Sequence, residues 1–371
     1  MKRIVMALAV AAVVGFAGQA SAENWWEKMS VKGDLRYRHE MIDTEDKDAR
    51  HRHRLRARFG IVAEVSKYTR VGVQLATGSD DPVSTNQTLD GAFTTKNIGV
   101  DMAYFTTILP KFDGLSITAG KFKNPFYKAG KSELIWDSDF NPEGGVAVYE
   151  HGFNDNTSLT LVGAGLWIDE RSSGDDSWMS AGQLIAHHEF DDNKTSFAVG
   201  GSIFNYVNVR GFAPFYDPDD SFGNSLAISV DGTDTSLVYA EKYELVEVFG
   251  EVTHEFEKIP VTVMADYVNN SAADSLNTGW LVGIRAGKAR KPGSLEFRYI
   301  YREVEKDAVV GVFSDSDFKG GGTDARGHEI GGGIALAKNT AFNATYFINK
   351  IGLDAEESDF NRLQLDIQLK F

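Results

Sequence analysis

Residues 362–371 read RLQLDIQLKF, and this stretch decides the class of fold. Its apolar members stand at every second position: Leu363, Leu365, Ile367, Leu369 and Phe371. Successive side chains of a β-strand point to opposite faces, so the pattern predicts a strand with one apolar and one polar face. Chain ends usually fray in water. An apolar face that runs to a terminal aromatic residue therefore favours a strand in a membrane barrel.

The same alternation runs through the rest of the chain. In residues 54–65, RLRARFGIVAEV, apolar residues fall on one face and arginines on the other. Several such segments reach the ~9–11 residues of a tilted membrane-spanning strand, against ~5–6 for an ordinary strand. We predict sixteen strands, at residues 31–41, 52–66, 69–78, 97–109, 115–123, 144–151, 157–168, 179–190, 194–206, 243–256, 260–269, 277–289, 293–304, 327–337, 340–349 and 361–371.

The connections between these strands fall into two sets. Those after the even strands are short: 67–68, 110–114, 152–156, 191–193, 257–259, 290–292 and 338–339. Those after the odd strands are usually longer: 42–51, 79–96, 124–143, 169–178, 207–242, 270–276, 305–326 and 350–360. Short periplasmic turns and long extracellular loops are typical of outer-membrane barrels. The chain is therefore predicted to be all-β, a transmembrane antiparallel β-barrel of about sixteen strands.

The N-terminus has the pattern of a secretory signal. Lys2 and Arg3 precede an apolar run, Ile4–Phe16, and Ala20-Ser21-Ala22 forms a small-residue cleavage site. The run is shorter than the ~20 residues of a spanning helix. Residues 1–22 are therefore expected to be removed, which leaves 23–371 as a single barrel domain.

Composition narrows the class of function. The chain has no cysteine, which excludes a disulfide framework and cysteine-ligated metal sites. Its net charge is −15, and it becomes −17 when the two basic residues of the signal are removed. A strongly acidic protein is an unlikely partner for nucleic acid.

The loop at residues 124–143 is too apolar for an exposed segment of its length. It holds an aromatic cluster together with four carboxylates, Glu133, Asp137, Asp139 and Glu143. Long loops without secondary structure are usually functional or disordered, and apolar side chains favour order. We expect this loop to fold into the barrel lumen and to narrow a pore. Its acidic residues at alternate positions also suit Ca²⁺, but the spacing and glycine of an EF-hand are missing, and no metal site is predicted.

A row of arginines falls on the polar faces of neighbouring strands. We predict that they form one basic wall of the pore constriction: Arg36, Arg38, Arg54, Arg56, Arg58, Arg70, Arg298 and Arg302. Facing this wall, the four loop carboxylates would set a transverse field, and charged rows of this kind are how pores select ions. The alternative is that the arginines are only the solvated lumen side of the barrel.

Two predicted strands do not alternate cleanly. In 97–109, Phe105 and Leu109 fall on the polar face, and 157–168 is partly apolar on both faces. Apolar lumen positions beneath an inward-folded loop would explain both cases.

No motif supports catalysis. The chain has neither a G-x-S-x-G nor an H-E-x-x-H sequence, so an enzyme is not expected and no cofactor is predicted.

Four stretches carry a resemblance to a known family: LATGSDDPVSTNQTL (75–89), AYFTTI (103–108), ITAGKFKNPF (117–126) and ELIWDSDFNPEGG (133–145). With them the chain resembles the Putative porin family of Gram-negative outer membranes. The resemblance implies a water-filled channel for passive diffusion of small hydrophilic solutes and ions, often trimeric, among outer-membrane lipid and lipopolysaccharide. The C-terminal pattern resembles the signature that the barrel assembly machinery reads.

Two other classes of function stay open from the sequence. One is a non-conducting structural or adhesin-like outer-membrane barrel, and the other is a soluble secreted β-sandwich or lectin. The solute is left open. The choice between anions and cations is also left open, because the arginine wall favours anions and the acidic loops favour cations.

Overall fold

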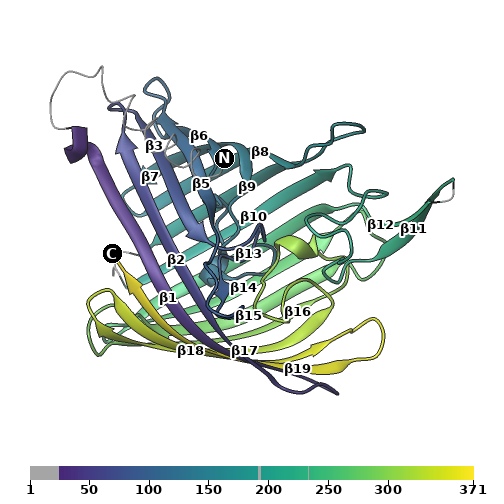
Figure 1. Ribbon diagram of the computed structural model, residues 1–371. Coiled ribbons are helices and arrows are strands. Elements are labelled where there is room, and N and C mark those ends of the chain that lie inside the picture. The colour runs from purple at the N-terminus through teal and green to yellow at the C-terminus, as the bar shows by residue number, and fades with distance from the viewer. Residues whose placement is uncertain (1–24, 191–193, 233) are drawn as a thin grey trace.

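The computed structural model describes residues 25–190, 194–232 and 234–371. Within them, sixteen long antiparallel strands close into a barrel, which confirms the predicted fold class (Figure 1). The last strand pairs with the first, with Asp34 opposite Lys370 and Thr44 opposite Phe360. The expected signal, residues 1–22, lies outside the described residues.

All sixteen predicted strands are present. In chain order they are β1 (Met29–Thr44), β2 (Arg50–Glu64), β3 (Thr69–Thr77), β5 (Ile98–Ile108), β6 (Leu115–Lys121), β7 (Glu143–Asn154), β8 (Thr157–Asp169), β9 (Ser177–Glu189), β10 (Thr195–Val207), β13 (Glu244–Phe256), β14 (Ile259–Asn270), β15 (Thr278–Gly287), β16 (Leu295–Val304), β17 (Ala325–Ala337), β18 (Thr340–Ile351) and β19 (Ser358–Lys370). Three shorter strands were not predicted. β4 (Gln87–Thr88) pairs with β2, and β11 (Leu226–Asp231) pairs with β12 (Asp234–Tyr239) as a hairpin within the loop before β13.

The helical content is three short 3₁₀ turns among the described residues, η2 (Trp25–Lys28), η3 (Ala129–Lys131) and η4 (Gly311–Phe313). No helix in the described part of the chain is long and apolar enough to cross a membrane.

The longest connections lie at one end of the barrel, as predicted, but the two sets overlap in length, because 45–49, 170–176, 271–277 and 352–357 at that end are no longer than the 288–294 turn at the other. The first loop spans only residues 45–49, because β1 and β2 extend further than the sequence indicated. The longest connections are 78–97, 122–142, 208–243 and 305–324, and all four are at the long-loop end.

The two faces of the strands divide as the alternation predicts. On β1, Tyr37 is 43% exposed on the outer face, whereas Arg38 beside it is 3% exposed on the lumen side. On β19, Ile367 and Leu369 are exposed on the outer face and Arg362 is buried inside. Such an apolar outer band suits a lipid environment.

The irregular strand β5 is explained by a bulge. The pairing of β3 with β5 shifts register between Gln74 and Leu75, so one extra residue of β5 is inserted there. Beyond the bulge the faces exchange, and Phe105 points outward with 45% of its surface exposed. The expectation that Phe105 packs beneath the loop was therefore wrong. For β8 the expectation was right, because Val162 and Leu166 belong to the buried apolar cluster inside the barrel.

Candidate functional site

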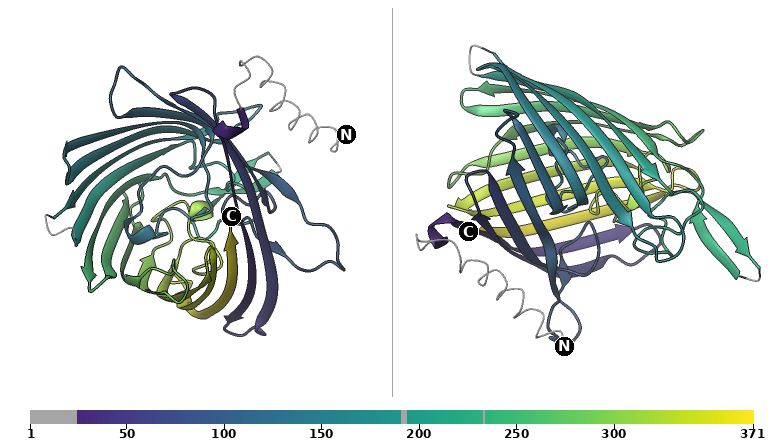
Figure 2. Two further views of the ribbon diagram at one scale, coloured as in Figure 1. Left: turned by 90° about the vertical axis from the view of Figure 1, so that its left-hand side faces the viewer. Right: turned by 90° about the horizontal axis from the view of Figure 1, so that it is seen from above.

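The loop joining β6 to β7, residues 122–142, lies inside the ring of strands, as the end-on view shows (Figure 2). A glycine stands at each side of it, Gly120 with φ 116° and Gly144 with φ 145°. A Cβ on Gly120 would meet the carbonyl oxygen of Ala103 at 2.3 Å. Only glycine combines this backbone conformation with such a close approach, so the chain can leave the sheet here.

One side of the loop is anchored by aromatic packing. The ring centroids of Phe126 and Trp136 lie 5.0 and 5.2 Å from that of Phe204 on β10, both edge to face. Phe140 stacks on Trp136 at 5.0 Å. Aromatic pairs in these geometries add to the stabilisation from burial. The apolar residues that made this loop unsuited to water therefore hold it to the barrel wall.

Hydrogen bonds to the same wall fix the backbone of the loop. The Tyr127 amide donates to the Gln183 side chain at 2.7 Å, and the Gln183 amide donates to the Tyr127 carbonyl at 3.1 Å. The Ser132 hydroxyl donates to Asp266 on β14 at 3.0 Å. The loop is thus attached to a rigid scaffold.

The opposite side of the loop presents Asp139 to the arginines of β2. Arg56 and Arg58 approach its Oδ1 at 3.2 and 3.1 Å. Asp34 on β1 lies on the other side of both arginines, 3.0 Å from Arg56 and 2.7 Å from Arg58. Two cations and two carboxylates therefore alternate, and this part of the wall is close to neutral.

Asp139 stays ionised in this setting. Burial opposes its charge, but the attraction of Arg56 and then Arg58 outweighs burial and lowers the pKa of Asp139 to about 2.

A second loop also enters the lumen, which the sequence did not lead us to expect. In residues 305–324, between β16 and β17, Val309 and Val310 are fully buried, and the Phe313 ring lies 5.1 Å from Phe140. Asp317 of this loop is 3.1 Å from Arg38 and 2.9 Å from Arg362. The two loops and the β19–β1–β2 wall therefore meet around one cavity, which Arg38, Asp139 and Asp317 line.

A repeated tetrapeptide is the sequence signal that would have found the second loop. Asp-Ser-Asp-Phe occurs at 137–140 and again at 315–318. In each copy the first aspartate accepts a hydrogen bond from the backbone amide of the second, at 2.7 Å for Asp137 and 2.8 Å for Asp315. The copies are joined, because the Ser316 amide donates to Asp137 at 2.8 Å.

Two of the predicted loop carboxylates do not reach the arginines of β1 and β2. Asp137 is enclosed by the two loops, and burial followed by the charge of Glu133 holds its pKa well above the usual range. Burial followed by the charge of Asp315 raises the pKa of Glu133 to about 8. Glu133 is therefore largely protonated at neutral pH.

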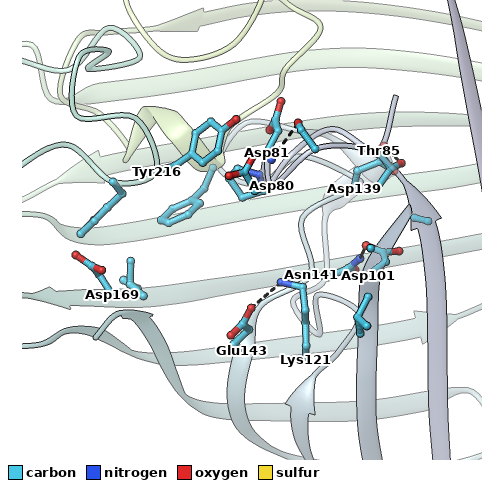
Figure 3. A pocket seen from close by; sticks show the side chains of 18 of the residues that line it. Asp80, Asp81, Thr85, Asp101, Lys121, Asp139, Asn141, Glu143, Asp169 and Tyr216 are labelled. Atoms are coloured by element: carbon cyan, nitrogen blue, oxygen red, sulfur yellow. Dashed lines mark hydrogen bonds and ion pairs between the residues drawn. The ribbon is translucent and has the colours of Figure 1, made fainter. Parts of the chain in front are cut away.

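The two loops separate two cavities inside the barrel. The vestibule, on the long-loop side, has a volume of about 660 Å³ (Figure 3). Its charged lining is six carboxylates and one lysine: Asp80, Asp81, Asp101, Asp139, Glu143, Asp169 and Lys121. The neck cavity, on the short-turn side, has a volume of about 290 Å³ and is lined by both signs of charge. Asp139 borders both cavities.

The predicted wall is only partly assembled at this point. Four of its arginines line the neck cavity: Arg36, Arg38, Arg56 and Arg298. Arg58 and Arg302 stand behind them in ion pairs, Arg302 at 2.7 Å from Asp315. Arg54 faces the 78–97 loop, with its guanidinium 3.4 Å from the Ser84 hydroxyl.

Two predicted residues lie elsewhere. Arg70 is exposed opposite Glu64, beside the 65–68 turn, and lines neither cavity, so it is not part of the neck wall. Glu143 lies in the vestibule, 2.8 Å from Lys121, rather than facing the arginines. Alternation predicts which face a side chain takes but not its height along the barrel.

The neck also contains carboxylates that were not predicted as site residues. They are Glu296, Asp315, Asp317, Glu329 and Asp366, and each forms an ion pair with an arginine. In the described residues no group of three or more His, Asp or Glu side chains is placed to hold a metal ion.

The fold is shared with solved outer-membrane porins. The chain is 10% identical to OprB of Pseudomonas putida, with a TM-score of 0.57 over 93% of this chain and 94% of that one. It is 11% identical to OmpF of Salmonella typhi, solved in complex with daunomycin, with a TM-score of 0.55 over 92% and 97% of the chains. OmpT of Vibrio cholerae, in a loop L8 deletion mutant, gives 12% identity and a TM-score of 0.50 over 93% and 100%. No curated protein matches the chain.

These features define the class as a porin-type β-barrel of the outer membrane of Gram-negative bacteria. A model of the Putative porin family matches residues 42–214 and 239–371, and the chain belongs to this family, which confirms the resemblance. Porins are typically not enzymes, in line with the missing catalytic motifs.

Proposed function

We propose that this protein is a channel for passive diffusion of small hydrophilic solutes and ions. The observation that carries the proposal is the pair of cavities, about 660 and 290 Å³, that share Asp139 within one closed barrel. Barrels of sixteen strands are wide enough for an aqueous channel. The 122–142 loop, the 305–324 loop and the arginine wall form its constriction.

We further propose that the channel prefers cations weakly. The arginines of the wall are largely balanced by carboxylates within 4 Å, whereas the vestibule holds six carboxylates against one lysine. A mouth lined by one sign of charge raises the local concentration of the opposite ion. The net field on an entering ion is therefore set by the vestibule more than by the wall.

Conductance in planar bilayers tests the first proposal. The folded protein is expected to insert and give discrete steps of current. Folded protein that gives no steps would instead support the alternative, a non-conducting structural or adhesin-like barrel. The reversal potential across a KCl gradient tests the second proposal, and an anion preference would contradict it.

The C-terminal strand is proposed as the assembly signal. Phe371 pairs with Gly33 through two backbone hydrogen bonds of 3.0 Å, at the seam where the barrel closes. Deleting Phe371 is expected to reduce the amount of folded barrel in the membrane without changing the conductance of what folds. We also propose a homotrimer, which native mass spectrometry of the detergent-extracted protein would test.

A further inference from the structure

One short turn differs from all the others in charge. Residues 288–294, Lys-Ala-Arg-Lys-Pro-Gly-Ser between β15 and β16, contain three basic residues, and no other short turn contains more than one. Lys258, in the next turn along the rim, adds a fourth. All four side chains are exposed, and none forms an ion pair with another described residue.

Hydrogen bonds fix the backbone of this turn. The Ser294 hydroxyl accepts hydrogen bonds from the amides of Arg290 and Lys291, at 2.9 and 3.0 Å. The Gly293 amide donates to the carbonyl of Ala335 on β17 at 2.8 Å, and the Ala335 amide donates back to Ser294 at 3.0 Å. The turn is therefore fastened to the neighbouring strand, which limits the conformational entropy lost when it binds a ligand.

An apolar groove begins where these cations end. A surface depression of about 980 Å³ runs over β14 to β18, with Lys258, Lys288, Arg290 and Lys291 at its rim. Its outer-face lining is apolar: Ile259, Leu295, Phe297, Ile334 and Phe342. Ile259, Leu295 and Phe297 remain 47–64% exposed.

The charge of the groove is mostly positive. Two carboxylates also line it, Glu255 and Glu296. Glu296 forms an ion pair with Arg285 at 2.9 Å. Four cations thus face one unpaired carboxylate. A basic rim at the membrane surface attracts anionic headgroups, at about 1 kcal/mol for each Lys or Arg.

We propose that this groove is a binding site for an anionic phospholipid of the periplasmic leaflet. The headgroup phosphate lies among Lys258, Lys288, Arg290 and Lys291, and an acyl chain lies along Leu295 and Phe297. A zwitterionic lipid fits the same apolar groove but gains less from the four cations. The site is on the outer face of the barrel, so it does not depend on whether the channel conducts.

Native mass spectrometry of the detergent-purified protein tests this site. Dioleoylphosphatidylglycerol is expected to bind more tightly than dioleoylphosphatidylcholine. The variant Lys288→Gln/Lys291→Gln should weaken phosphatidylglycerol binding by about thirtyfold and leave phosphatidylcholine nearly unchanged. Leu295→Ser should weaken both lipids, because it removes apolar contact rather than charge.

A matched control is available on the opposite part of the rim. Lys67→Gln/Lys111→Gln removes the same charge from the 65–68 and 109–114 turns and should leave binding of both lipids unchanged. Equal losses in the two double variants would overturn the proposal, because they would indicate a general surface potential. Displacement of the lipid by millimolar inorganic phosphate would also overturn it, in favour of a plain anion site. Heat-induced unfolding in detergent at the temperature of the wild type shows that each variant has folded.

Discussion

The two copies of Asp-Ser-Asp-Phe fold alike and are used differently. In both, the first aspartate caps the backbone amide of the second, and the second aspartate meets two arginines. The copy at 137–140 is fixed by stacked aromatic rings, and its Asp139 borders both cavities. In the copy at 315–318, Phe318 packs on Phe347 in a small separate cluster.

The difference shows how a local motif acquires a role. Four residues determine the turn, since the hydrogen bond from the amide of the second aspartate to the first aspartate lies within the motif. The packing of the rest of the loop then determines what that carboxylate borders. Asp317 lies between Arg38 and Arg362, and burial of Asp317 is outweighed by these arginines, so its pKa stays well below the usual range. We therefore expect the second copy to stabilise the position of the first, because Asp317 is held by two arginines and the Ser316 amide donates a hydrogen bond to Asp137.

The largest effect is expected from removing the aromatic anchor of the first loop. Trp136→Ala should lower the free energy of unfolding by about 3–5 kcal/mol and make the channel current noisy, because the loop loses its attachment to Phe204. Phe318→Ala should cost less, since its cluster is smaller. Heat-induced unfolding in detergent and bilayer recordings measure the two effects. Equal current noise in both variants would contradict this prediction, because it would mean that the two loops contribute equally to the constriction.

Removing the arginines should change ion selectivity. Arg56→Ser/Arg58→Ser leaves Asp34 and Asp139 without partners, so the ratio of K⁺ to Cl⁻ permeability should rise about threefold, equivalent to about 0.6 kcal/mol. Arg38→Ser is the comparison at the second copy and should change the ratio less. The reversal potential across a KCl gradient gives both values. An unmoved potential in the double variant would place the constriction elsewhere.

Raising the pH should also increase cation preference, by a smaller amount. Glu133 has a pKa of about 8 in the folded protein, above the 4.5 of a free glutamate, so it gains its charge as the pH rises through about 8. Its contribution to stability is full below about 4.5 and is lost as the pH rises towards 8. Reversal potentials at pH 6 and pH 9 measure the change in selectivity. Glu133→Gln should reduce this difference, and any remainder is assigned to Asp137, whose pKa is also raised.

The smallest effect on ion selectivity is expected from Asp139 and Asp317, the second aspartate of each Asp-Ser-Asp-Phe copy. Asp139→Asn should reduce cation preference by less than about twofold, because it removes one charge from a balanced group. Asp317→Asn should leave selectivity unchanged and lower the resistance to unfolding at neutral pH. This loss should vanish at low pH, as protonation removes the wild-type ion pairs. A selectivity change in Asp317→Asn would contradict this, and would mean that the charge of Asp317 acts on the passing ion although two arginines pair with it.

Much of the fold could be predicted because the strands are long and regular. The outer face must be apolar for lipid, so a period of two appears in nearly every strand. The prediction failed at Phe105, where one inserted residue reverses the faces: the change of phase was visible in the sequence, but a bulge and an apolar lumen position produce the same pattern. It also failed at Arg70, where the face was right and the height along the barrel was not.

The sequence by itself determined the closed barrel, the division into an apolar exterior and a charged lumen, and the apolar character of the 122–142 loop. These depend on the chemistry of side chains at fixed spacing, which the sequence displays directly. Only the tertiary structure decided that a second loop enters, that Asp139 faces Arg56 and Arg58, and that Arg38 pairs with Asp317. Those contacts join residues far apart in the chain, and their register depends on how all sixteen strands close.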